Sequence, residues 1–189
     1  YKGLRLIREN FAPFTAADKS YQNAYTFDYP TNLSQETTTV SYTVQNDTEG
    51  QWNKIAVLLN SASKELTVRL SDTSVSDWVV IADGTQAGVT KIREVKGSSF
   101  KVDANSAVIA VDKESFEKNP IKSDMGKVEV EYLHVNGRRQ LAKPVVLQGE
   151  YGTSYIASPS AGVPAVYVLD SVEGETSGEY SEETKKVTY

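Results

Sequence analysis

The sequence has no cysteine among its 189 residues. This absence excludes disulfide frameworks, cysteine-ligated metal sites and thiol chemistry together. It also argues against a small secreted domain of the disulfide-stapled eukaryotic kind. Histidine occurs only once, as His134, so we expect no zinc site built from histidine side chains.

A basic stripe and long apolar runs are also missing. The formal net charge is -5, and acidic and basic residues are mixed along most of the chain. Nucleic-acid binders need clustered lysines and arginines to neutralise phosphates, so we expect no nucleic-acid partner. The longest apolar run, Ile55–Leu59, is far shorter than the roughly 20 residues of a membrane helix. We therefore expect no membrane span.

Helical spacing of apolar residues marks the start of the chain, at Tyr1, Leu4, Ile7 and Phe11. No N-cap residue precedes this stripe, and Pro13 lies just beyond it, where a helix ends. A helix without a beginning suggests a piece of a longer protein. Its apolar stripe needs a partner surface, which is either the following domain or a missing one.

From about Asn23 the pattern changes to short strands separated by turn signals. The expected strands are 37–44, 54–60, 64–70 and 77–82, followed by weaker ones at 91–95, 99–102 and 107–111. Short strands at this spacing, with no helices between them, predict an antiparallel β-sandwich.

Residues 117–126 interrupt this pattern with polar and helix-breaking residues, and Pro120 favours an extended conformation before it. We place a domain boundary here. Residues 127–135 then alternate as a half-buried strand does, and Asn136-Gly137 is a strong hairpin signal. Further strands are expected at 140–148, 165–170, 179–180 and 185–189.

The first part of the chain resembles a known family. Gly3-Leu-Arg-Leu-Ile-Arg8, followed by Phe11-Ala-Pro-Phe14, resembles the last barrel helix and exit segment of pullulanases, in the α-amylase superfamily. The next hundred residues are similar to the C-terminal β-sandwich of these enzymes. The segments that carry this similarity are Trp52–Asn60, Ser76–Gly84 with Ala87-Gly88, and Val102–Ile109.

The second part, residues 127–189, resembles the mucin-binding-protein (MucBP) module of lactobacillar and other Gram-positive surface proteins. The matching residues are Val128, Val130, Tyr132, Asn136-Gly137, Leu147-Gln-Gly149, Tyr151–Tyr155, Gly178 and Val187–Tyr189. The family usually has Pro-Gly-Tyr before its fourth strand, where this sequence reads Gly162–Tyr167. The resemblance implies a small β-grasp-like fold and a wall-associated setting.

Together these patterns predict a mainly all-β chain. We expect residues 1–14 to be the terminal helix and exit segment of a missing catalytic barrel, and residues 15–117 to be a pullulanase-type C-terminal antiparallel β-sandwich. Residues 118–126 are expected to be a linker, and residues 127–189 a MucBP-like module.

No catalytic residue is expected in this chain. Glycosidic hydrolysis needs two carboxylates that face each other across the scissile bond. The catalytic motifs of the amylase superfamily, with their flanking arginine and histidines, have no counterpart here. The carboxylates Asp103, Asp112, Glu114 and Glu117 lie in turn-rich or polar contexts, and we interpret them as solvated surface charge.

A catalytic triad and a calcium site are formally possible, and each has a simpler interpretation. A Ser-His-Asp triad is formally possible with His134, but a surface histidine beside the hairpin is favoured. An acidic cluster offers oxygen ligands for calcium but lacks EF-hand spacing, so a solvated face is favoured and neither metal nor cofactor is expected. Its members are Asp170, Glu173, Glu175, Glu179, Glu182 and Glu183.

Aromatic residues are the remaining binding signal, with eleven tyrosines and two tryptophans. Trp78 lies inside an apolar strand and is assigned to the core. Trp52 follows Glu49-Gly50-Gln51 in a loop, where its indole can be exposed. Tyr151 and Tyr155 flank a glycine turn. Trp52, Tyr151 and Tyr155 are therefore the candidate glycan-binding residues, with packing as the default interpretation for each.

Two functions remain open. One is a non-catalytic C-terminal accessory region of a secreted pullulanase, an α-1,6-debranching glycoside hydrolase, that supports the barrel and associates with the cell surface, mucus or glycans. The other is an adhesin segment whose main role is glycan or mucin binding. The expected partners are an upstream catalytic barrel of the same chain and α-glucan, mucin or cell-wall glycans. The expected location is extracellular, secreted or cell-wall associated.

Overall fold

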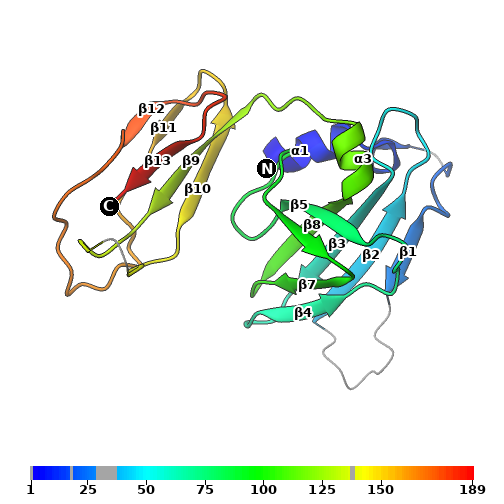
Figure 1. Ribbon diagram of the computed structural model, residues 1–189, viewed down its shortest axis with the longest axis horizontal. Coiled ribbons are helices and arrows are strands. Elements are labelled where there is room, and N and C mark those ends of the chain that lie inside the picture. Colours follow the sequence, from blue (N-terminus) through cyan, green and yellow to red (C-terminus); the bar gives the residue numbers. More distant parts are fainter. Residues whose placement is uncertain (1, 18, 29–37, 137–138) are drawn as a thin grey trace. The chain divides into compact units, whose positions relative to one another are not determined.

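The computed structural model describes residues 2–17, 19–28, 38–136 and 139–189. The chain divides into two compact units, Tyr1–Lys122 and Ser123–Tyr189, which are described separately (Figure 1).

A six-stranded antiparallel sheet forms the centre of the first unit, in the order β1-β2-β3-β8-β5-β6 (Figure 1). Its strands are β1 (Tyr25–Asp28), β2 (Thr39–Gln45), β3 (Lys54–Asn60), β5 (Asp77–Ala82), β6 (Arg93–Lys96) and β8 (Ser106–Asp112). A separate antiparallel pair consists of β4 (Leu66–Arg69) and β7 (Ser99–Val102). The predicted antiparallel β architecture is confirmed.

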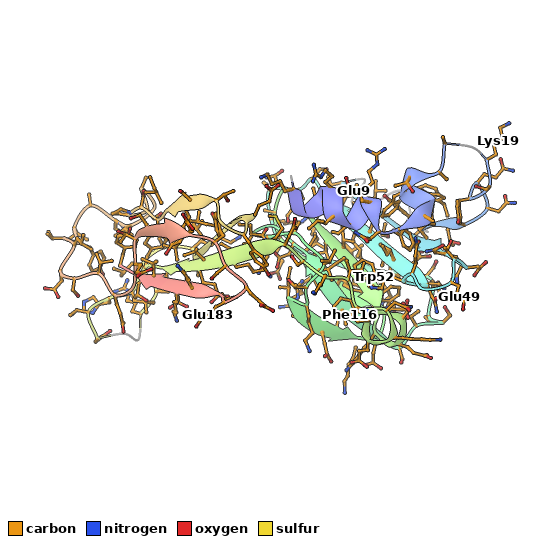
Figure 2. All side chains as sticks on the ribbon, turned by 90° about the horizontal axis from the view of Figure 1, so that it is seen from above. Glu9, Lys19, Glu49, Trp52, Phe116 and Glu183 are labelled. Atoms are coloured by element: carbon orange, nitrogen blue, oxygen red, sulfur yellow. The ribbon has the colours of Figure 1, made fainter. Side chains whose placement is uncertain are left out.

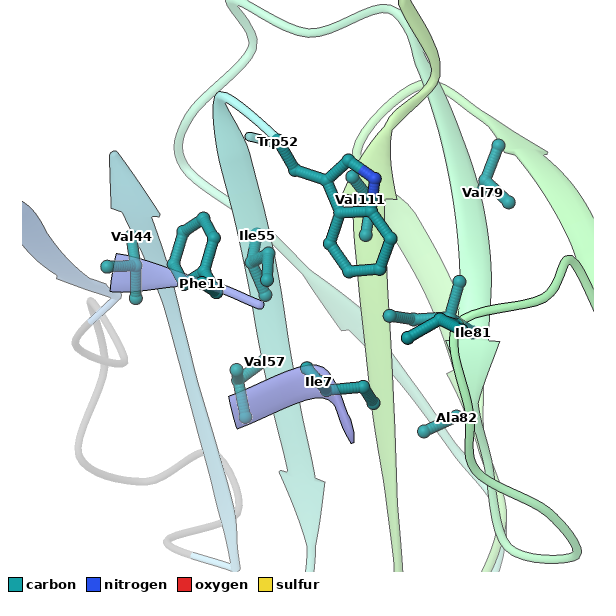
Figure 3. Close-up of a cluster of buried hydrophobic side chains, with 11 residues drawn as sticks. Ile7, Phe11, Val44, Trp52, Ile55, Val57, Val79, Ile81, Ala82 and Val111 are labelled. Carbon is teal, nitrogen blue, oxygen red and sulfur yellow. The ribbon is translucent and has the colours of Figure 1, made fainter. Parts of the chain in front are cut away.

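Both faces of the six-stranded sheet are covered, which explains why its central strands are apolar throughout. Side chains alternate between the two faces along a strand. In β3, Ile55 and Val57 join a buried cluster that includes the N-terminal residue Phe11, whereas Ala56 and Leu58 join a second cluster with residues of β4 and β7. Figure 3 shows the first cluster, with Phe11 lying close to Val44 and Ile55.

The N-terminal helices α1 (Lys2–Glu9) and α2 (Ala12–Thr15) are part of this packing. Ile7 and Phe11 are buried in the first cluster. A Cβ on Gly3 would lie 1.8 Å from the carbonyl oxygen of Ala87, so only glycine allows α1 to approach this closely. Of the apolar stripe that the sequence shows, Ile7 and Phe11 therefore pack on the domain that follows, whereas Leu4 is 47% exposed. No helix in the described part of the chain is long and apolar enough to cross a membrane.

A short helix, α3 (Lys113–Lys118), follows β8 and was not predicted. Its N-cap is Asp112, whose side chain accepts a hydrogen bond from the backbone N–H of Ser115, as N-cap residues do. Most of the helix falls in the predicted β-sandwich, residues 15–117, and its last residue, Lys118, is the first residue of the predicted linker. The first strand of the second unit, β9, begins at Met125.

The second unit contains a mixed sheet in the order β10-β9-β13. Its strands are β9 (Met125–Glu131), β10 (Val145–Glu150) and β13 (Lys185–Thr188). β10 is antiparallel to β9, whereas β13 is parallel to it. A separate antiparallel pair consists of β11 (Ser154–Ile156) and β12 (Ser177–Glu179). Neighbouring parallel strands at the start and end of the unit fit the β-grasp-like fold that the resemblance implies.

The core of the second unit is small and aromatic. Val128, Val130 and Val187 from the sheet pack with Tyr132 and Tyr155. Close to this core, a Cβ on Gly149 would lie 2.2 Å from a ring carbon of Tyr180, so the missing side chain makes room for that ring.

The prediction of a strand at residues 165–170 is wrong. These residues have no regular structure, and Val166 and Val168 are 82% and 90% exposed. Pro164 lacks a backbone N–H, and the segment belongs to a long loop between β11 and β12 on the surface of the unit. The hairpin turn predicted at Asn136-Gly137 lies partly outside the described residues.

Candidate functional site

Trp52 is fully buried, which agrees with packing as its default interpretation and excludes the alternative that its indole is exposed. Its indole N–H donates a hydrogen bond to the carbonyl of Asn119 at 3.1 Å, and its ring stacks on Phe116 with centroids 5.8 Å apart. Phe116 belongs to α3, the helix that the sequence did not reveal, so its cover over Trp52 was not foreseen. A sugar ring has no accessible face to stack on here. Trp78 is also fully buried, as predicted.

The loop that carries Trp52 is held by polar side chains. Gln51 Oε1 accepts hydrogen bonds from the backbone N–H of Ala12 at 2.8 Å and from Asn46 Nδ2 at 3.0 Å. Asn119 Nδ2 donates to the carbonyl of Gln51 at 2.7 Å. These contacts connect the start of α2 to the residue after α3. Figure 2 shows Trp52 and Phe116 within the first unit, whereas Lys19 and Glu49 lie at its periphery.

The two tyrosines that flank the glycine turn have different environments. Tyr155 is 3% exposed, its hydroxyl donates to the carbonyl of Glu175 at 3.1 Å, and Lys185 Nζ lies 5.4 Å from its ring centroid. Tyr155 is therefore a core residue, which agrees with packing as its default interpretation and leaves its ring no accessible face for a glycan. Tyr151 is 40% exposed beside Gly152, whose φ of +77° favours glycine. Of the three candidates, Tyr151 is the one with an accessible ring.

Asp112 is buried, so its interpretation as a solvated carboxylate is wrong. Its Oδ1 accepts from the N–H of Ser115 and its Oδ2 from the N–H of Lys54, each at 2.9 Å, and Ser115 Oγ donates to it as well. Both oxygens are thus used to cap α3 and to hold the start of β3. Glu114 and Glu117 are exposed beside a polar cavity of about 350 Å³.

Ion pairs hold other carboxylates of the first unit. Hydrogen bonds from Lys113 and Lys91 lower the pKa of Glu94 to about 2. Burial raises the pKa of Asp72, but hydrogen bonds led by that of Lys54, at 2.6 Å, outweigh it and lower the pKa to about 2. A general acid needs the opposite shift, because it must stay protonated near neutral pH.

His134 lies at a groove in the second unit. It follows β9, where the N–H of Leu133 donates to the carbonyl of Tyr189 at 2.9 Å. The imidazole contacts the ring of Tyr167 edge-on, with centroids 6.0 Å apart. Tyr132 donates its hydroxyl to the carbonyl of Ser158 at 3.1 Å and so holds the long loop against the end of β9.

The groove consists of two adjoining cavities of about 380 and 720 Å³, within the usual size range of ligand sites. Both are lined by Leu133, His134, Val135, Ser171 and Tyr189. The smaller cavity adds mostly aromatic and aliphatic side chains, Tyr167 among them, and the larger one adds Glu131, Glu173 and Lys186. We call the two cavities together the His134 groove.

Sequence reasoning missed this groove because it assigned residues 165–170 to a strand. The available signal was the pair Pro159 and Pro164 in a stretch without clear periodicity. Loops longer than about 12–15 residues without secondary structure are uncommon in compact domains and are usually either functional or disordered. The loop between β11 and β12 exceeds that length.

The acidic residues near the C-terminus do not gather into a metal site within the described ranges. Those ranges hold no group of three or more His, Asp or Glu side chains that could bind a metal ion. Glu175 instead lies 3.5 Å from Lys185 Nζ, and Glu131 lies 2.9 Å from Lys186 Nζ.

Comparisons with known proteins divide the chain in a similar way. Residues 23–112 match the SpuA C-terminal family, and residues 127–189 match the MucBP domain family. No curated protein matches the chain.

Several solved structures of pullulanases are similar to part of the chain. A pullulanase from Bacillus acidopullulyticus is 24% identical with a TM-score of 0.47, over 58% of this chain and 13% of that one. Pullulanase type I from Bacillus subtilis str. 168 is 15% identical with a TM-score of 0.43, over 56% and 14%. A pullulanase from Anoxybacillus sp. LM18-11 is 14% identical with a TM-score of 0.43, over 56% and 14%. The match thus spans only 13% to 14% of these enzymes.

Proposed function

Because the chain joins a pullulanase-type SpuA C-terminal domain to a MucBP domain, we propose that it is a non-catalytic accessory region of a secreted, α-glucan-debranching glycoside hydrolase. The first domain supports the catalytic barrel. The MucBP domain attaches the enzyme to glycans of a cell surface or of mucus. One observation carries this proposal, namely that the two domains follow each other in a single chain.

The packing of the N-terminal helices supports the role of the first domain. Ile7 and Phe11 are buried in its core, and Gly3 lies in close contact with Ala87. The segment that resembles the last barrel helix of pullulanases is therefore anchored in the sandwich. An upstream barrel attached to this helix would be held against the domain by a buried core.

The carboxylates described above support a non-catalytic role. Asp112 caps a helix, and ion pairs lower the pKa values of Asp72 and Glu94 to about 2. With pKa values this low, Asp72 and Glu94 are ionised at neutral pH and cannot donate a proton to a leaving sugar.

A second candidate function is an adhesin segment in which glycan binding is the main role. The His134 groove favours it, because the groove lies entirely within the MucBP domain and needs no neighbouring enzyme. The open reading frame upstream of Tyr1 distinguishes the two. A barrel with three catalytic acidic residues supports the accessory role, whereas repeated MucBP domains without a barrel support the adhesin role.

Two assays on the purified chain test the proposal. We expect no reducing-sugar release from pullulan, starch or maltotriosyl substrates, and release that survives repurification and scales with protein concentration would refute the non-catalytic role. We also expect the folded chain to be retained on immobilised mucin, cell-wall glycan or amylopectin, with heat-unfolded chain as the control. Retention on none of these would refute the attachment role.

A further inference from the structure

The His134 groove has one apolar wall and one polar wall. Tyr167 and Val168 stand on the loop side of the smaller cavity, and Val168 is 90% exposed. Exposed apolar side chains grouped around a cavity are typical of binding sites rather than of ordinary protein surface. A ligand with flat apolar faces can therefore contact this wall.

Aromatic contacts join residues that line the smaller cavity. The rings of Tyr132 and Tyr189 stack with centroids 5.9 Å apart and planes inclined by 17°. His134 contacts Tyr167 edge-on, so the position of the Tyr167 ring is set by a neighbour that itself lines both cavities. Pre-positioned rings lower the entropy that is lost when a ligand binds.

Carboxylates dominate the polar wall. Lys186 Nζ donates a hydrogen bond to Glu131 at 2.9 Å, and this bond, together with the charges of Glu131, Glu129 and Glu173, raises the pKa of Lys186. Glu131 and Glu173 line the larger cavity together with Lys186, and Asp170 adds a further carboxylate on the apolar side. The groove is therefore locally negative, with acceptors available to hydroxyl groups.

We propose that the His134 groove binds an uncharged oligosaccharide and discriminates against glycans that carry sialic acid or sulfate. Sugar rings stack their apolar faces on the Tyr167 side while their hydroxyl groups donate to the carboxylates of the opposite wall. The inference rests on the proposed glycan attachment, and it adds where on the MucBP domain the glycan binds and that the glycan is uncharged.

The discrimination follows from the excess negative charge at the polar wall. An anionic substituent within several ångströms of that wall is repelled, and we expect binding about five-fold weaker or more at low salt. The difference should shrink as salt is added, because exposed charges are screened.

The test uses the full chain on an array of immobilised neutral oligosaccharides, each paired with its sialylated counterpart. Tyr167→Ala removes the apolar wall, whereas Tyr167→Phe keeps the ring. Glu173→Gln lowers the charge of the polar wall, and Glu179→Gln is its matched control on exposed β12. Ile156→Ala, on an exposed position outside the groove, controls for loss of apolar surface.

We expect the wild-type chain to bind at least one neutral glycan and to bind its sialylated partner more weakly. Tyr167→Ala should lower neutral binding at least ten-fold with an unchanged thermal midpoint, and Tyr167→Phe and Ile156→Ala should leave it within two-fold. Glu173→Gln should reduce the difference in affinity between each neutral glycan and its sialylated partner, and Glu179→Gln should leave that difference unchanged. If Tyr167→Ala unfolds the second unit, the comparison of Glu173→Gln with Glu179→Gln decides whether the groove binds the glycan.

Three outcomes would overturn the inference. A preference for the sialylated partners contradicts the charge argument. Binding that survives Tyr167→Ala but is lost in Tyr151→Ala places the site at the Gly152 turn instead. In both cases the attachment role stands, because the chain still binds glycan. A chain that binds no glycan at all refutes both the groove and the attachment role.

Discussion

Replacing Trp52 by alanine should destabilise the first unit strongly. The indole has no exposed surface, stacks on Phe116 and donates a hydrogen bond to the carbonyl of Asn119. Removing a buried tryptophan costs about 3–5 kcal/mol in transfer free energy and cavity formation. A domain of this size has a free energy of unfolding of about 5–15 kcal/mol, so the variant should lose about a fifth of it or more.

Urea unfolding followed by tryptophan fluorescence measures this loss. The remaining tryptophan, Trp78, is buried in the same unit on the opposite face of the sheet, so it still reports its unfolding. With a slope of about 2 kcal/mol per molar urea, the midpoint should fall by roughly 2 M. Trp52→Phe should lose less, because it keeps a ring against Phe116 and loses mainly the hydrogen bond, worth about 1–2 kcal/mol.

Leu4→Ala is the matched control within the first unit, because Leu4 is 47% exposed and its loss should change the free energy of unfolding by about 0.5 kcal/mol or less. A Trp52→Ala chain that unfolds within about 1 kcal/mol of the wild type would refute the burial of this side chain. It would also restore Trp52 as a platform for glycan binding.

Three further predictions concern packing, charge and domain structure. Gly3→Ala should lower the thermal midpoint of the first unit by several degrees, since its Cβ would overlap the backbone of Ala87, whereas Leu4→Ala at a 47% exposed position should not. The stability that the Lys54 hydrogen bond gives to ionised Asp72 should be present above the unfolded pKa of about 4 and should be lost as pH falls towards 2. Urea midpoints should show no such loss in Asp72→Asn. Limited proteolysis should cut first within 119–126, and early cuts within 60–110 that leave this stretch intact would show that the boundary is wrong.

The strands of the first unit were the most predictable part of the fold. β3 and β5 have the bounds that the sequence predicts, because both are buried on both faces and end at polar or turn residues. Helix α3 was missed because its six residues are too few for helical periodicity to show. Its N-cap, Asp112, stands at the end of a strand, where a carboxylate was read as surface charge. That one omission also left the exposure of Trp52 undecided, since α3 supplies the ring that covers it.

The His134 groove lay beyond local patterns for a different reason. Its walls come from the end of β9, the loop after β11 and the end of β13, which are far apart in the sequence. Only the parallel pairing of β13 with β9 brings Tyr189 beside Leu133. Hydrophobic periodicity reports which face of a strand is buried, but it does not report which strand becomes its neighbour.

The parallel pairing of β9 and β13 also has a mechanical consequence. In parallel strands, the start of β9 and the end of β13 lie at opposite ends of the pair, whose register runs from Lys185 opposite Val128 to Thr188 opposite Glu131. A force that pulls the two ends of the module apart therefore slides these strands along each other. Their backbone hydrogen bonds are loaded in shear and must break together, rather than being peeled apart one after another. If the module attaches its chain to a surface, as proposed, and is pulled between its two ends, these strands would resist the force in shear.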